Sequence, residues 1–240
     1  MDIPAFYREI QGQSSSVQES IFNEAESLVK LTQLHNFMLD YENLKSVIAN
    51  RPESDVVSAA IKEYQLALFS LTVGQYRHAF GGLRLFFELM TSTIQFSAHE
   101  IDLRLWSKGE KDINWSALIN AETGVFSVNF IKAFNPELSE NTKQFRAIAE
   151  KIYRECSEFV HGNAITHKSL PERIIFNREI FLSWHQKAES IRVVIAFIFA
   201  ARYLTHIDPA AAKVVEPTFI DIIGHLPAIQ AIFSEPPKGE

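Results

Sequence analysis

Apolar residues recur with the 3.6-residue period of an α-helix in almost every long segment of this sequence. A half-buried strand would need strict alternation of apolar and polar residues, and the short run RIIF, residues 173–176, is the only candidate for it. Nine Gly and nine Pro in 240 residues are also too few for a turn-rich all-β protein. The sequence therefore predicts an all-α fold, a single-domain bundle of about six to eight helices.

The expected helix ends are marked by proline, glycine and polar turn residues. Five long helices are expected, over about 16–49, 55–73, 76–96, 140–161 and 178–205. Pro52 ends the first of them and Gly74 the second, because proline lacks a backbone donor and glycine breaks a helix. The stretch 99–138 is expected to be broken up, with one short helix at NWSALINAE.

Prolines also organise the last part of the chain. Asp208-Pro209 and Glu216-Pro217 each predict the start of a short helix, because proline is favoured at the first helical position. The final SEPPKGE predicts a frayed tail. We therefore expect one structural domain in three parts: an N-terminal helix in 1–56 that packs on the core, a helical core in 57–205, and short helices with a tail in 206–240.

Charge and cysteine content limit the classes of function. The net charge of −6, without runs of like charge, argues against a broad nucleic-acid-binding face but leaves a local basic patch open. Cys156 is the single cysteine, so no intrachain disulfide forms and a reducing compartment is expected.

The sequence also predicts a cytoplasmic protein that does not enter a membrane. The first residues, MDIPAFYREI, have neither the basic nor the apolar region of a secretory signal. The most apolar run, VVIAFIFAA at 193–201, is far shorter than the about 20 residues that span a bilayer. This run therefore predicts a buried core helix.

The helix expected over 76–96 carries a narrow polar stripe on an otherwise apolar surface. The stripe consists of Arg77, Gly81, Arg84, Glu88, Thr91, Ser92 and Gln95. A helix that is apolar on most of its surface belongs in the interior. The stripe therefore either faces solvent, with an Arg84–Glu88 ion pair, or lines a cleft. Gly81 and Gly82 each cost about 1 kcal/mol relative to alanine in mid-helix, and close approach of another backbone is the usual reason for such glycines.

A second polar face lies on the helix expected over 140–161. Arg154 and His161 lie opposite the apolar arc of this helix, about 20° from each other and roughly 10 Å apart along the axis. Ser157 and Glu150 lie beside them. Gly162 suits the left-handed position just past a helix end, which puts His161 in the last turn, where the helix dipole favours a charged imidazole. The pair suits either proton transfer or an ordinary solvated helix end.

The stretch YRECSEFVHG, residues 153–162, resembles the loose Arg-x4–6-His signature of HEPN domains, which are all-α. GQYRHAFGGLRLFFELM, residues 74–90, is similar to an earlier helix of many such proteins, and the resemblance covers roughly 57–205. The resemblance implies a homodimer that pairs through the motif helix. Catalytic members of the family are metal-independent ribonucleases of toxin, antiviral and RNA-processing systems, which implies RNA as substrate and no metal or cofactor.

Carried over to this chain, the resemblance implies that Arg154 and His161 are the catalytic pair and that a partner chain, related by a two-fold axis, completes the active site. His161 would exchange a proton with the 2′-hydroxyl or the leaving oxygen, and Arg154 would stabilise charge on the phosphate. The residues expected in support are Arg84, Glu88, Ser157 and Arg77. Glu155 stands where active members place Asn, Asp or His, which favours an inactive HEPN-like module as the alternative.

Three hypotheses follow from the sequence. The first is a HEPN-like ribonuclease of a defence or toxin-type system, and the second is a non-catalytic HEPN-like module that dimerises or docks a protein partner. The third is a helical sensor in which the stripe over 76–96 lines an aromatic-rich pocket. Other chemistry is not indicated, because the eight histidines show no metal-ligand spacing and Cys156 falls on the apolar arc as a core residue.

Overall fold

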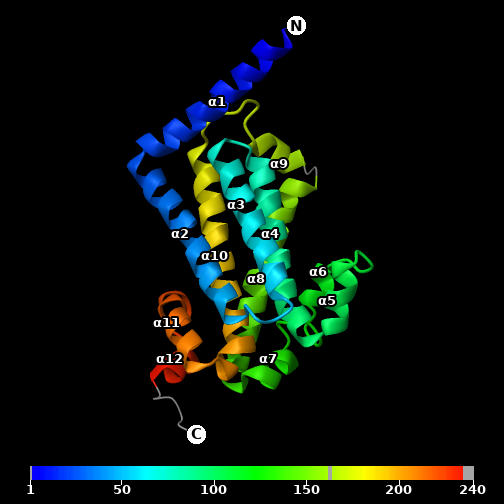
Figure 1. Cartoon of the computed structure of the whole chain (residues 1–240). Coiled ribbons are helices and arrows are strands. Elements are labelled where there is room, and N and C mark those ends of the chain that lie inside the picture. The colour runs from blue at the N-terminus through cyan, green and yellow to red at the C-terminus, as the bar shows by residue number, and fades with distance from the viewer. Residues whose placement is uncertain (1, 162–163, 235–240) are drawn as a thin grey trace.

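The computed structural model describes residues 2–161 and 164–234, and every regular element within these ranges is a helix (Figure 1). The α-helices are α1 Ile3–Asn23, α2 Ala25–Val47, α3 Ser54–Thr72, α4 Tyr76–Ala98, α5 Glu100–Ser107, α6 Trp115–Leu118, α7 Val128–Phe134, α8 Thr142–Val160, α9 Ala164–Ser169, α10 Arg178–Tyr203, α11 Pro209–Ile223 and α12 Pro227–Ser234. Short 3₁₀ helices lie at Pro136–Asn141 and Leu204–His206. The all-α prediction is confirmed, but the described chain has about ten helices of seven or more residues rather than six to eight.

The centre of the bundle is an aromatic cluster to which four helices contribute one ring each. Tyr64 of α3 lies 5.3 Å from Tyr41 of α2 and 5.0 Å from Phe86 of α4, measured between ring centroids. Trp184 of α10 lies 6.0 Å from Tyr64, and its indole N–H donates to the Ala79 carbonyl of α4 at 3.0 Å. All four rings are fully buried, so α2, α3, α4 and α10 share one core.

The N-terminal region forms two helices instead of the single helix expected over 16–49. The first begins at Ile3, where the Asp2 carboxylate accepts a hydrogen bond from the Ala5 N–H at 3.3 Å. Glu24 then adopts extended backbone, and α1 turns away from α2 across the end of the bundle (Figure 1). Glu24 accepts hydrogen bonds from Ser27 and, at 2.8 Å, from Arg178 Nε of α10. The break is therefore fixed in part by a contact 154 residues away along the chain.

Two glycines set the relation between α3 and α4. Gly74 adopts φ +77°, which ends α3 as expected. A Cβ placed on Gly82 would lie 2.9 Å from the Cβ of Ala67 in α3, so the close approach expected for this glycine is confirmed. For Gly81 that expectation is wrong, since a Cβ there would meet only the Val160 side chain, at an ordinary 3.7 Å.

The C-terminal part differs from the prediction at one proline. Helix α11 begins at Pro209 as expected, with the Asp208 carboxylate accepting from two backbone N–H groups at 3.0 Å. Pro217 does not begin a second helix but lies inside α11. Burial of Phe219 and Ile223 in the same helix offsets the cost of about 3 kcal/mol for an interior proline. Residues 235–240, expected to form a frayed tail, lie outside the described residues.

The candidate strand at 173–176 is a loop, and the apolar helices of the described chain are too short or too polar to span a membrane. RIIF, residues 173–176, forms no strand; the Ile175 carbonyl accepts a hydrogen bond from the Tyr76 hydroxyl at 3.0 Å, which ties this loop to the start of α4. Across the ranges that the structure covers, no helix is long and apolar enough to cross a bilayer.

Candidate functional site

Arg154 and His161 both have exposed side chains at the C-terminal end of α8. Neither side chain has a hydrogen-bond or ion-pair partner among the described residues, whereas Arg146 on the same helix lies 3.6 Å from Glu150. His161 ends the helix, and its backbone N–H donates to the Ser157 carbonyl at 3.0 Å. Gly162, expected as the left-handed cap, lies outside the described residues. The end of α8 therefore presents an unpaired guanidinium and an unpaired imidazole.

Acidic residues of α8 surround this pair, and two of them are neutralised. Glu155 contacts Lys187 of α10 at 3.0 Å and Lys151 at 3.9 Å. Glu150 is paired with Arg146, and Glu158 is exposed. The carboxylate that directly follows Arg154 in sequence is thus held by two ammonium groups, which lowers its repulsion of an incoming phosphate.

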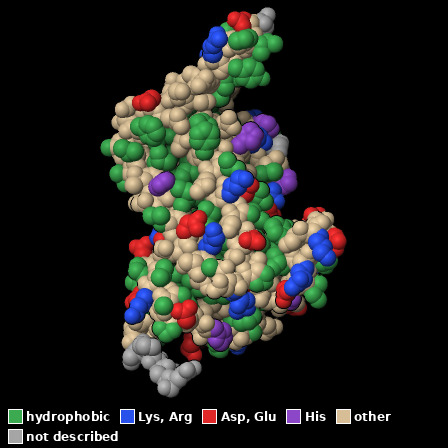
Figure 2. Space-filling model, viewed as in Figure 1, with side chains coloured by type: hydrophobic (Ala, Val, Ile, Leu, Met, Phe, Trp, Pro, Cys, Tyr) green, Lys and Arg blue, Asp and Glu red, His purple; other side chains and the backbone are tan. Residues whose placement is uncertain are grey.

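Arg77 of α4 lies at the same end of α8. Its Nη1 donates to the Phe159 carbonyl at 2.8 Å, and its Nη2 lies 3.3 Å from Nδ1 of His167 in α9. Arg77 therefore binds one of the carbonyls that the helix end leaves without an intrahelical partner, where the dipole favours a cation. Figure 2 shows histidine and Lys or Arg side chains gathered at the end of the molecule where α9 lies. Sequence reasoning missed His167, because the histidines were considered only for metal-ligand spacing.

Arg84 and Glu88 lie on the inner side of α8, where both bind Tyr153. Arg84 Nη2 donates to the Tyr153 hydroxyl at 2.5 Å, and this hydroxyl donates to Glu88 Oε1 at 2.6 Å. The direct Arg84–Glu88 distance is 3.6 Å, which confirms the predicted ion pair. Trp115 stacks on the Tyr153 ring at 3.9 Å. We call these four residues the Tyr153 cluster.

Burial raises the pKa of Tyr153 to about 12, and its hydrogen bond to Glu88 acts in the same direction. The phenol is therefore neutral near pH 7 and can accept from Arg84 while it donates to Glu88. No hydrogen bond or ion pair within the described ranges joins Arg84 or Glu88 to Arg154 or His161. Sequence reasoning missed Tyr153 because a tyrosine on the apolar arc of a helix is expected to be a core residue.

The remaining polar side chains of the α4 stripe are buried or half-buried. Thr91 and Ser92 are fully buried, and Gly81 faces the Val160 side chain. Arg84 Nε, Thr91 Oγ1 and Gln95 Oε1 are buried without a hydrogen-bond partner. At Gly81, Arg84 and Glu88 the stripe is therefore covered by α8 and does not line the pocket that the sensor hypothesis requires.

Two side chains of α8 have structural roles. The Ser157 hydroxyl donates to the Tyr153 carbonyl of its own helix at 2.7 Å. Cys156 is fully buried, as predicted, and burial raises the pKa of its thiol to about 12. The thiol is therefore protonated at neutral pH and is no nucleophile.

Tyr153→Phe is expected to lower the free energy of unfolding by about 1–2 kcal/mol, because it removes both hydrogen bonds to the charged groups but keeps the stacking on Trp115. Urea unfolding followed by circular dichroism measures the change. Ser157→Ala is the matched control, since its hydroxyl bonds only its own helix, and we expect a change of less than about 0.5 kcal/mol. Equal effects of the two variants would contradict a structural role of the cluster.

Compared with protein-family models, with curated proteins and with solved structures, the chain matches none. The resemblance to HEPN domains therefore stays a prediction from the sequence.

Proposed function

We propose that the protein is a HEPN-like, metal-independent endoribonuclease of a defence or toxin-type system, with Arg154 and His161 as its catalytic pair. The observation that carries the proposal is the pair itself: both side chains are exposed at one helix end and neither has a partner among the described residues. A guanidinium free to bind phosphate and an imidazole free to move a proton are the two groups that cleavage of an RNA phosphodiester requires.

The reaction that these groups support is an internal transfer. The ribose 2′-oxygen attacks the adjacent phosphorus while the bond from phosphorus to the 5′-oxygen breaks, which yields a 2′,3′-cyclic phosphate and a 5′-hydroxyl. One imidazole accepts the proton of the 2′-hydroxyl, and a second gives a proton to the leaving oxygen. Arg154 stabilises the charge that builds on the phosphate oxygens.

The need for two proton transfers supports a homodimer in which α8 of each chain lies at a two-fold axis. Each protomer supplies one His161, so a symmetric seam brings an acid and a base to one scissile bond. Arg77 supports the pair by fixing the α8 end through the Phe159 carbonyl at 2.8 Å. The Tyr153 cluster, in which Arg84 and Glu88 take part, holds α8 against α4 one residue before Arg154.

Local charge also supports contact with RNA despite the net charge of −6. Arg154 has no partner among the residues that the structure describes, and Arg77 and the exposed Lys168 lie at the same end of the bundle. Glu155, which follows the motif arginine, is engaged by Lys187 at 3.0 Å. A short basic patch of this kind suits a few phosphates rather than a long duplex.

A second candidate function is a non-catalytic HEPN-like module for dimerisation, partner binding or sensing. The observation that favours it is the number of large apolar side chains exposed on α1, α2 and α3, among them Phe6, Tyr7, Leu39, Leu66 and Phe69. Contiguous exposed apolar surface marks interaction sites.

The proposal is tested with purified full-length protein and a 5′-labelled RNA in the presence of EDTA. We expect cleavage products that end in a 2′,3′-cyclic phosphate, and no cleavage at a position where a deoxynucleotide removes the 2′-hydroxyl. Cleavage at the deoxynucleotide, or cleavage that requires a divalent cation, contradicts the mechanism. No cleavage across a panel of structured and single-stranded RNAs would favour the non-catalytic module.

A further inference from the structure

The apolar stripe of α1 extends past the part of the helix that packs on the bundle. Val17 and Ile21 are buried under the helix. The same stripe continues toward the N-terminus through Ile3, Phe6, Tyr7 and Ile10, at the spacing i, i+3, i+4 and i+7. Exposure is 60% for Ile3, 44% for Phe6 and 65% for Tyr7. We call residues 3–10 the arm; on its apolar face Ile10 is half-buried, whereas Ile3, Phe6 and Tyr7 are exposed.

The arm stands away from the body of the protein. Figure 1 shows the N-terminal half of α1 projecting beyond the end of the bundle. Between Phe6 and Ile10 on the arm and the loop at 171–174 lies a cavity of about 360 Å³. The arm therefore faces this loop across the cavity, while Ile3, Phe6 and Tyr7 stay exposed.

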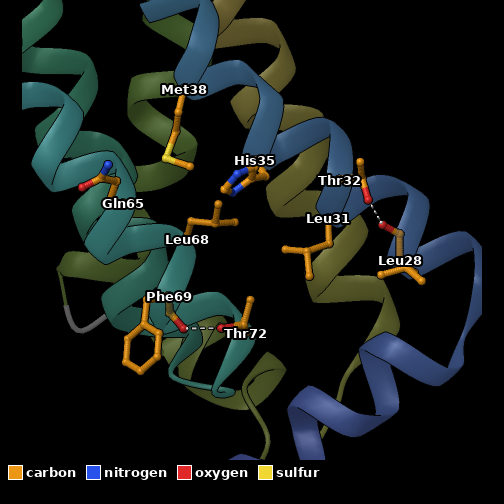
Figure 3. A pocket seen from close by; sticks show the side chains of 9 residues that line it. All are labelled: Leu28, Leu31, Thr32, His35, Met38, Gln65, Leu68, Phe69 and Thr72. Carbon is orange, nitrogen blue, oxygen red and sulfur yellow. Dashed lines mark hydrogen bonds between the residues drawn. The ribbon is translucent and has the colours of Figure 1, made fainter. Parts of the chain in front are cut away.

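An apolar groove of about 480 Å³ lies between α2 and α3. Leu28, Leu31 and Met38 of α2 line one wall, and Leu68, Phe69 and Thr72 of α3 line the other (Figure 3). Phe69 is 60% exposed at its rim. A groove with this lining suits the apolar face of a helix, held by anchors at i, i+3, i+4 and i+7.

The arm and the groove match in length. Residues 3–10 of a helix span about 11 Å, and the α2 wall between Leu28 and Met38 spans about 15 Å, at 1.5 Å per residue. Four anchors on two helical turns therefore fit within the groove. The pattern and length of the arm thus suit the groove of this same chain.

The arm cannot fill its own groove without unpacking α1. Helix α1 leaves α2 at Glu24, which Arg178 Nε holds at 2.8 Å, and it leads across the end of the bundle (Figure 1). Turning the arm back toward the α2–α3 groove would expose Val17 and Ile21, which are buried. The arm of another chain can enter the groove without exposing Val17 and Ile21 of either chain.

We propose that a second copy of the chain places its arm in the α2–α3 groove, and that the exchange is reciprocal. Each chain then gives one arm and receives one, which closes a two-fold dimer. This contact uses α1, α2 and α3, so it is separate from the α8 seam of the proposed nuclease and does not depend on it. Where both contacts form, the chain assembles beyond a dimer, and loss of the arm contact leaves the α8 dimer.

The area available approaches what a specific dimer needs. An aromatic ring buries about 150–250 Å² when fully covered, and Phe6 and Tyr7 are about half exposed, so the four rings of two arms supply on the order of 400 Å². The groove walls lose a similar area. Together with Ile3 and Ile10, two such contacts approach the roughly 1,200 Å² at which specific interfaces begin.

The proposal is tested by substituting three exposed apolar residues and measuring the assembly of each full-chain variant by sedimentation velocity and light scattering. Tyr7→Asp disables the arm, Phe69→Asp disables the groove, and Ile101→Asp on α5, where the side chain is 73% exposed, is the matched control. We expect the arm and groove variants to raise the dimer Kd at least about 30-fold and the control to leave it unchanged. Phe69→Ser, which adds no charge, should act as Phe69→Asp does. Unchanged circular dichroism shows that each variant is folded.

Mixing the arm variant with the groove variant makes the test specific. The Phe69→Asp chain keeps its arm and the Tyr7→Asp chain keeps its groove, so the mixture should regain one arm–groove contact that neither variant alone can make. Wild-type protein that is monomeric at about 100 μM, well above the Kd expected of an interface of this size, would overturn the proposal. Wild-type assembly that neither variant weakens, or that only the arm variant weakens, would overturn it as well.

Discussion

His161→Ala is expected to lower the rate of RNA cleavage by about 10²–10⁴-fold, the range that a positioned acid–base group contributes. The imidazole is exposed at the end of α8 and has no partner within the described chain, so its removal leaves the packing of the helix intact. Arg154→Ala should cost about 10²–10³-fold, because it removes one charged donor to the phosphate in the transition state.

The measurement is single-turnover cleavage of a labelled RNA in EDTA, with wild type and variants side by side. Arg154→Lys keeps the charge but loses the planar fork of donors, so it should recover only part of the rate. Lys143→Ala is the matched control on the same helix; its side chain is exposed near the start of α8, far from Arg154, and we expect a change of less than about threefold. If His161→Ala cleaves at the wild-type rate, the imidazole takes no part in the chemistry and the non-catalytic module is the better description.

Gly82→Ala is expected to lower the free energy of unfolding by about 1–3 kcal/mol, although alanine is the better helix former. The new methyl group would lie 2.9 Å from the Cβ of Ala67 and 3.3 Å from its Cα. Backbone atoms cannot turn aside as a flexible side chain can, so α3 and α4 must separate. Separation would disturb the Tyr64–Phe86 contact in the aromatic core.

Gly81→Ala is the matched control, because it makes the same chemical change one residue earlier. Its methyl group would meet only Val160 Cγ2 at 3.7 Å, so we expect stabilisation by about 0.5–1 kcal/mol from helix propensity alone. Urea unfolding of both variants gives the difference directly. Stabilisation by both substitutions would mean that α3 and α4 are not in contact at Gly82.

The sequence predicted those helix boundaries that local chemistry decides. Gly74 ends α3 with a positive φ, and Asp208 with Pro209 begins α11, because a glycine turn and a capped proline start act within a few residues. The break at Glu24 depends on Arg178 of a distant helix, and Pro217 is tolerated because its helix is held by buried side chains. Neither cause can be recognised from the few residues of sequence around Glu24 or Pro217.

The same distinction applies to the candidate site. The helical wheel placed Arg154 and His161 opposite the apolar arc, and both are exposed in the structure. The wheel did not predict that Tyr153 would join Arg84 to Glu88, because hydroxyl contacts across two helices depend on their relative rotation. It also gave no sign that Lys187 engages Glu155, since the two residues meet only when α10 packs on α8.

The burial of Cys156 has a practical consequence for spectroscopy. This residue is the only cysteine in the sequence, and its thiol is inaccessible in the core of the bundle. A cysteine introduced at any exposed position would therefore be the sole reactive group for a maleimide dye or a nitroxide. Distances between labelled chains can thus be measured on a protein that keeps its native sulfur, without first engineering a cysteine-free background.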